Sequence, residues 1–148
     1  MKKLSVFILL IAATFTSCSS DDDAPGISEA NLIGTWQWTA AAENGTPETL
    51  DECDLQDTYE FRTDGTLVSI FYNSTVTNGQ TICNGPNTDE FKWSLSGETL
   101  TFTFDGGTVT ETETATITTL NGDTLMIEYR DEETPGEITV YTETYRKL

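Results

Sequence analysis

The sequence predicts an all-β fold, a single antiparallel barrel whose eight strands follow one another in up-and-down order. Apolar and polar residues alternate with a period of two over most of residues 34–146, and no stretch keeps a helical period. Short turn signals such as Asp64-Gly65 separate successive strands, and threonine, which suits a pleated surface, is abundant. A meander of this length leaves two exposed edges unless it closes, so a barrel is more economical than an open sheet or a sandwich.

The elements follow in order along the chain. One helical turn is expected over residues 28–32, with Ser28 as its N-cap. The expected strands cover residues 34–40, 58–63, 66–73, 91–95, 100–104, 108–118, 125–129 and 138–146. Two polar stretches that contain glycine and proline, 41–56 and 74–88, are expected to be loops.

One face of the expected strand 108–118 carries both apolar and acidic residues. We expect Ala115 and Ile117 to lie inside the barrel, with Glu111 and Glu113 nearer to a rim. The two glutamates could imitate the carboxylate pair of a glycosidase, but two carboxylates on one strand face are commonplace.

Residues 1–17 are expected to form a secretion signal. Lys2-Lys3 precede an apolar run, Leu4 to Ala13, that is too short to span a bilayer. Cleavage by a general signal peptidase is the ordinary interpretation of such a segment. Here the small pair Thr16-Ser17 stands directly before Cys18, which resembles a bacterial lipobox. That resemblance implies cleavage before Cys18 and attachment of acyl chains such as palmitate to it, so that Cys18 anchors the protein in a membrane.

The residues after the cysteine are expected to form an acidic tether, 18–28, before a barrel domain that covers 29–148. Ser19-Ser20-Asp21-Asp22-Asp23 resembles the acidic surface-export signal of some Gram-negative outer-membrane lipoproteins, although a plain solvated spacer is the alternative. The resemblance predicts a protein in the outer membrane that faces the cell exterior.

Charge and composition exclude several functions. The chain has 7 basic and 25 acidic residues, and without Lys2 and Lys3 the mature chain would carry a net charge of −20. Such a surface repels nucleic acid and anionic lipid headgroups. The sequence contains no histidine, which excludes histidine-based triads, proton shuttles and metal sites. The sequence implies no cofactor and no metal, and a solvated surface is favoured over a calcium site for its acidic clusters.

Several motifs together resemble a known family. Gly34-Thr35-Trp36 looks like the Gly-x-Trp signature that opens the first strand of lipocalins. The closer resemblance is to bacterial lipocalin-like lipoprotein domains, which add a lipobox, a cysteine pair around an Asp-Gly hairpin and a Trp-x-Leu-x-Gly-x-x-Leu segment, here Trp93 to Leu100. The resemblance spans about residues 29–148. It implies that Gly34, Trp36 and Arg146 close one end of the barrel, with the arginine packed across the tryptophan.

Cys53 and Cys83 are expected to form a disulfide, because two thiols of one small domain pair in an oxidising envelope. A reactive or metal-binding pair is the alternative, but Asp51, Glu52 and Asp54 would raise the pKa of a thiol rather than lower it.

Function depends on the barrel interior, which could hold an apolar or amphipathic ligand. The candidate lining residues are Trp38, Tyr59, Phe61, Phe71, Phe91, Trp93, Phe102 and Tyr141. An eight-stranded barrel is either filled by side chains or holds one small ligand. So many bulky residues favour a largely filled lumen with room for a pocket at one mouth. Two functions stay open: a non-enzymatic binding module, and a structural or interaction protein whose filled barrel contacts a protein or glycan through its loops.

Overall fold

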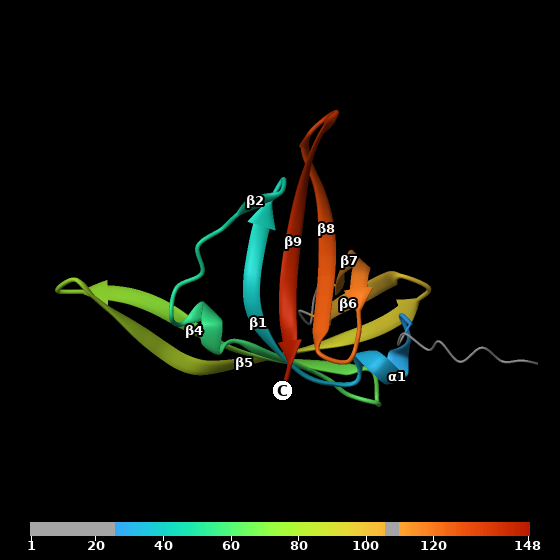
Figure 1. The fold of residues 1–148 in the computed structure, drawn as a ribbon, viewed down its shortest axis with the longest axis horizontal. Helices are drawn as coiled ribbons and strands as arrows, with labels where there is room; N and C mark the ends of the chain where they lie inside the picture. The colour runs from blue at the N-terminus through green and yellow to red at the C-terminus, as the bar shows by residue number, and fades with distance from the viewer. Residues whose placement is uncertain (1–25, 106–109) are drawn as a thin grey trace, which may run out of the picture.

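The computed structural model describes residues 26–105 and 110–148 (Figure 1). The expected signal segment, Cys18 and most of the expected tether therefore lie outside the described residues. No helix among the described residues is long and apolar enough to cross a membrane. The elements are α1 (Glu29–Leu32), β1 (Gly34–Glu43), β2 (Thr46–Pro47), the short 3-10 helix η1 (Asp54–Gln56), β3 (Thr58–Phe61), β4 (Thr66–Thr77), β5 (Gln80–Ser96), β6 (Thr99–Asp105), β7 (Thr110–Leu120), β8 (Thr124–Thr134) and β9 (Glu137–Lys147).

The strands form a closed antiparallel barrel, which confirms the predicted fold class. The order β1-β3-β4-β5-β6-β7-β8-β9 follows the sequence, and β9 returns to pair with β1 along most of its length. The two-residue strand β2 folds back on the end of β1 and adds no wall to the barrel. The expected helical turn is also confirmed, because the Ser28 side chain accepts a hydrogen bond from the backbone N–H of Asn31.

One end of the barrel is closed by a packed floor. α1 lies at the end opposite the tip of the β8–β9 hairpin (Figure 1). Its last residue, Leu32, and the neighbouring Trp36 of β1 are 0% exposed. Ala115 and Ile117 face inward as predicted. The buried cluster that forms the core consists of Leu32, Trp36, Phe61, Leu67, Trp93, Leu100, Ala115, Ile117, Leu120, Leu125, Ile127 and Tyr145.

The cation over Trp36 is Lys147, so the predicted role of Arg146 is wrong. The Lys147 Nζ lies 4.9 Å from the ring centroid of Trp36 and donates a hydrogen bond to the Asn31 carbonyl at 3.0 Å. Arg146 pairs instead with Gln37, whose Oε1 accepts from its guanidinium at 2.7 Å. Directly opposite residues of neighbouring strands share a face, and Trp36 stands opposite Lys147. Because successive residues of a strand point to opposite faces, a register shifted by one residue would place Arg146 over the Trp36 ring and turn Lys147 outward.

Gly34, which begins the Gly-x-Trp motif, has a structural reason to be glycine. Its φ is +129°, a conformation that side chains disfavour, and a Cβ added there would lie 3.0 Å from Cε of Lys147. The absence of a side chain at Gly34 therefore lets Lys147 reach the floor.

The other end of the barrel is open because the strands diverge. β7 pairs with β8 only from Thr116 to Leu120, and β5 pairs with β6 only from Lys92 to Ser96. The β4–β5 and β8–β9 hairpins consequently project to different sides of the molecule (Figure 1). The barrel wall is therefore incomplete near these diverging strands.

Two expected loops are partly strand. β4 and β5 stay paired as far as Thr77 and Gln80, so most of 74–88 belongs to a long hairpin. Its turn residues Asn78 and Gly79 have φ values of 52° and 76°, the left-handed pair that a tight two-residue hairpin requires. Similarly, β1 continues to Glu43 and turns at Asn44-Gly45, so only the later part of 41–56 is irregular. In both places an Asn-Gly pair turns a hairpin rather than marking a loop.

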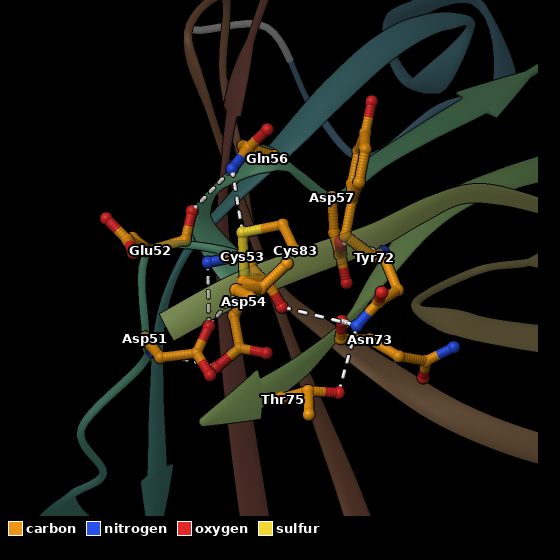
Figure 2. Close-up of a disulfide and its surroundings, with 12 residues drawn as sticks. Asp51, Glu52, Cys53, Asp54, Gln56, Asp57, Tyr72, Asn73, Thr75 and Cys83 are labelled. Atoms are coloured by element: carbon orange, nitrogen blue, oxygen red, sulfur yellow. Dashed lines mark hydrogen bonds between the residues drawn. A yellow bond between two sulfur atoms is a disulfide. The ribbon is translucent and has the colours of Figure 1, made fainter. Parts of the chain in front are cut away.

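The predicted disulfide is confirmed. Cys53, which is 0% exposed, and Cys83 on β5 are bonded, with their Cα atoms 5.3 Å apart. Figure 2 shows the polar frame around the bond: the Asp51 carboxylate accepts from the backbone N–H of Cys53 at 2.7 Å, and the Gln56 amide lies 3.4 Å from Cys83 Sγ. The bond fastens the segment before β3 to the projecting β4–β5 hairpin.

Candidate functional site

An inner cavity of about 400 Å³ lies in the barrel. Five of its lining residues, Phe61, Leu67, Leu125, Ile127 and Tyr145, are no more than 4% exposed. This volume falls in the range of roughly 300–1,000 Å³ that is typical of small-molecule sites. The inner cavity is lined by Tyr59, Phe61, Leu67, Asp89, Phe91, Phe102, Phe104, Glu111, Glu113, Leu125, Ile127, Tyr129 and Tyr145.

Aromatic pairs form much of its wall. Tyr59 and Tyr145 meet edge to face with ring centroids 5.2 Å apart, and Phe102 stacks on Tyr129 at 6.4 Å. Such pairs contribute roughly 0.5–1.5 kcal/mol beyond the area they bury. Because these rings come from β3, β6, β8 and β9, they hold the cavity wall in place from several strands.

An outer cavity of about 650 Å³ adjoins the inner one, and both are lined by Glu113 and Tyr129. It opens where the unpaired parts of β7 and β8 separate. Its lining is more polar and consists of Trp38, Ala41, Ala42, Glu48, Thr112, Glu113, Thr114, Tyr129, Arg130, Asp131, Tyr141, Thr142 and Glu143.

Most predicted lining residues face these cavities. The inner cavity is lined by Tyr59, Phe61, Phe91 and Phe102, and the outer cavity by Trp38 and Tyr141. The lumen is therefore filled at the floor and hollow above it, with a pocket toward one mouth.

Two predicted lining residues, Trp93 and Phe71, border neither cavity. Trp93 is 8% exposed, meets the Phe61 ring edge to face at 5.4 Å and donates its indole N–H to the Thr66 carbonyl, so it belongs to the floor. Phe71 lies at the irregularity in β4 where the hairpin leaves the barrel. Alternation thus identifies the inward face of a strand, but it does not show which inward side chains border a cavity.

The sequence analysis did not predict several of the lining residues, among them Tyr129, Tyr145 and Glu143. A signal for two of them was present: Glu143 and Tyr145 alternate with period two from Tyr141, which was predicted to face inward. Glu143 is thus an inward glutamate on a strand face that also carries Tyr141 and Tyr145.

The Glu143 carboxylate is the central polar group of the site. It accepts hydrogen bonds from the hydroxyls of Tyr145 and Tyr129 and is partly buried. Burial raises the pKa of Glu143, and the neighbouring charges of Glu113 and Glu48 raise it further, while the two tyrosine hydrogen bonds oppose the shift. Burial and the nearby Glu143 in turn raise the pKa of Tyr145, which keeps its hydroxyl a donor.

Replacing Glu143 with glutamine should therefore stabilise the protein at pH 8. Since the folded-state pKa of Glu143 lies above its unfolded value, ionisation costs stability once the pH has risen through the folded pKa. We expect the denaturation midpoint of E143Q to exceed that of the wild type at pH 8, and the difference to shrink as the pH falls toward the unfolded pKa. Urea titrations at several pH values measure this.

The matched control for that prediction is Glu137→Gln, the same change at an exposed position on the same strand. An equal effect of both variants at every pH would show that general charge repulsion, rather than burial of Glu143, is responsible.

A protein-family model described as a lipocalin-like domain matches residues 32–127. No curated protein matches the chain. Among solved structures, the bovine lipocalin allergen Bos d 2 is 21% identical, with 82% of this chain and 76% of that chain covered and a TM-score of 0.46. Bovine odorant-binding protein in complex with undecanal is 20% identical, with 82% and 74% covered and a TM-score of 0.43. The family match extends from α1 into β8, across more than half of the sequence, and the chain therefore belongs to the lipocalin-like domain family.

Proposed function

We propose that this protein is a non-enzymatic binding protein that holds one small apolar or amphipathic ligand in its inner cavity. The observation that carries the proposal is the cavity itself, about 400 Å³ of space walled by aromatic and aliphatic side chains above a packed floor. Burial of apolar ligand surface supplies the affinity of such a site. The same cavity counts against the alternative, an interaction protein whose barrel is filled and whose loops alone meet a protein or glycan.

The test uses the uncharged fluorescent probe N-phenyl-1-naphthylamine. We expect saturable binding with one probe per protein, and at least a tenfold loss of affinity in Phe102→Asp, because a carboxylate in the apolar wall must be desolvated when the probe enters. The control is Ile138→Asp, which places the same charge at a side chain that is 54% exposed and borders neither cavity. Equal affinities for the two variants would contradict binding in the inner cavity.

We further propose that the protein is an outer-membrane lipoprotein, anchored through Cys18 and facing the cell exterior. The support is the charged start at Lys2-Lys3, the apolar run that follows and the cysteine after Thr16-Ser17. Cys18→Ser should move the protein from the membrane fraction to the soluble fraction of the cells that make it, as measured by fractionation and blotting. Retention of that variant in the membrane would contradict lipidation.

Protease treatment of intact cells should digest the wild type, and protection of the domain would contradict surface exposure.

A further inference from the structure

The lining of the two cavities is acidic as well as aromatic. It contains the carboxylates Glu48, Asp89, Glu111, Glu113, Asp131 and Glu143. Arg130 is the basic residue among the described lining residues, and its guanidinium already pairs with Glu128 at 2.8 Å with its side chain 65% exposed. A ligand that enters between β7 and β8 therefore meets a path lined by negative charge.

Glu143 differs from the other lining carboxylates in its surroundings. Asp89, Glu111 and Glu113 are exposed, whereas Glu143 is partly buried beside tyrosines. The ion pairs among the described residues join Arg62 to Glu60 and Arg130 to Glu128, so neither includes Glu143. A carboxylate shielded from water interacts more strongly with a cation than one in bulk solvent.

The tyrosines around Glu143 add aromatic surface that attracts cations. Tyr129 and Tyr145 donate their hydroxyls to the carboxylate, and Tyr59 packs against the Tyr145 ring at 5.2 Å. Aromatic rings bind organic ammonium groups in proteins when the cation lies within about 6 Å of the ring centroid. The aliphatic and phenylalanine wall of the inner cavity continues beyond these tyrosines and suits an apolar body.

We infer that the ligand of this protein is a cationic amphiphile, an apolar body that occupies the inner cavity and carries an amine that docks on Glu143 among Tyr59, Tyr129 and Tyr145. The inference rests on the proposed function, because it names the ligand class of the same site. It also predicts discrimination: a fatty acid of the same length brings a second carboxylate to an acidic cavity, and like charges repel.

The test compares decylamine, 1-decanol and decanoate, which share one alkyl chain, as competitors of bound N-phenyl-1-naphthylamine at pH 7. Displacement of a cavity-bound probe distinguishes entry into the cavity from adsorption on the acidic surface. We expect the amine to displace the probe at a concentration at least tenfold below that of the alcohol, with decanoate weakest. In Glu143→Gln the preference for amine over alcohol should fall to about one, whereas Glu137→Gln should keep the wild-type ratio.

Each outcome bears on a different claim. If 1-decanol displaces the probe as well as decylamine does, the inference about the amine is overturned and the proposed function stands. An amine preference that persists in Glu143→Gln also overturns the inference, because it then arises from the acidic surface. If the probe does not bind, or no competitor displaces it, the proposed function fails together with the inference.

Discussion

Replacing Cys53 and Cys83 together with alanine should lower the free energy of unfolding by about 3–4 kcal/mol. The disulfide links residues 30 positions apart in the sequence, and closing a loop of that length removes about this much entropy from the unfolded chain. For a domain of this size the loss corresponds to a fall of roughly 10–15 °C in melting temperature. Urea denaturation of both proteins under non-reducing conditions measures the difference.

The structure adds a reason to expect a loss of order as well as of stability. The segment before β3 is held by the bond and by the Asp51 carboxylate, which accepts from the backbone of Cys53 and Asp54. Without the bond, this segment is released from the β4–β5 hairpin, whose outer part extends beyond the barrel (Figure 1). Hydrogen exchange should therefore increase first at the end of this hairpin.

Reduction provides the control for the disulfide prediction. A reductant such as dithiothreitol should lower the stability of the wild type to that of the double variant and leave the double variant unchanged. Cys53→Ala alone should resemble the double variant, because the bond is lost in both. A wild type that is insensitive to reductant while its thiols are shown to be free would contradict the prediction.

Period-two patterning predicted the barrel well because each hairpin is a local structure. Asp64-Gly65 and Ser96-Gly97 lie at hairpin turns that join strands close to those expected. The long hairpin around Asn78-Gly79 was missed because its strands are mostly exposed and carry no regular apolar alternation, so the period-two pattern cannot reveal them. A strand that leaves the barrel has no core side to mark it in the sequence.

The candidate site was predicted less completely, for a reason of geometry. Alternation assigns a residue to the inward face of a strand but does not say whether its side chain borders a cavity or is covered by its neighbours. Trp93 and Phe102 were both correctly placed inward and stand opposite each other on β5 and β6, yet Trp93 packs against Phe61 and Phe102 borders the inner cavity. Period two from Tyr141 places Glu143 on the inward face, but the hydroxyls of Tyr129 and Tyr145 that surround its carboxylate are recognised only in the structure.

The second large effect on stability is expected at Trp36, the buried aromatic side chain in the floor of the barrel. Trp36→Ala should lower the free energy of unfolding by about 3–5 kcal/mol, the range for removing a large buried aromatic side chain. The side chain is 0% exposed, and its indole N–H donates to the Leu32 carbonyl at 2.8 Å, which holds α1 against the barrel. Urea denaturation of the variant should show this loss.

The cation over the ring is tested separately, with two neighbouring residues as matched variants. Lys147→Met should cost about 1 kcal/mol, because it removes the contact with the Trp36 ring and the hydrogen bond to the Asn31 carbonyl. Arg146→Met should change the free energy of unfolding by no more than about 0.5 kcal/mol, because the hydrogen bond between Arg146 and Gln37 is exposed to solvent. In the Trp36→Ala background the cost of Lys147→Met should shrink, because the ring is gone. A larger cost for Arg146→Met than for Lys147→Met would show that the arginine closes the barrel and that the observed register is wrong.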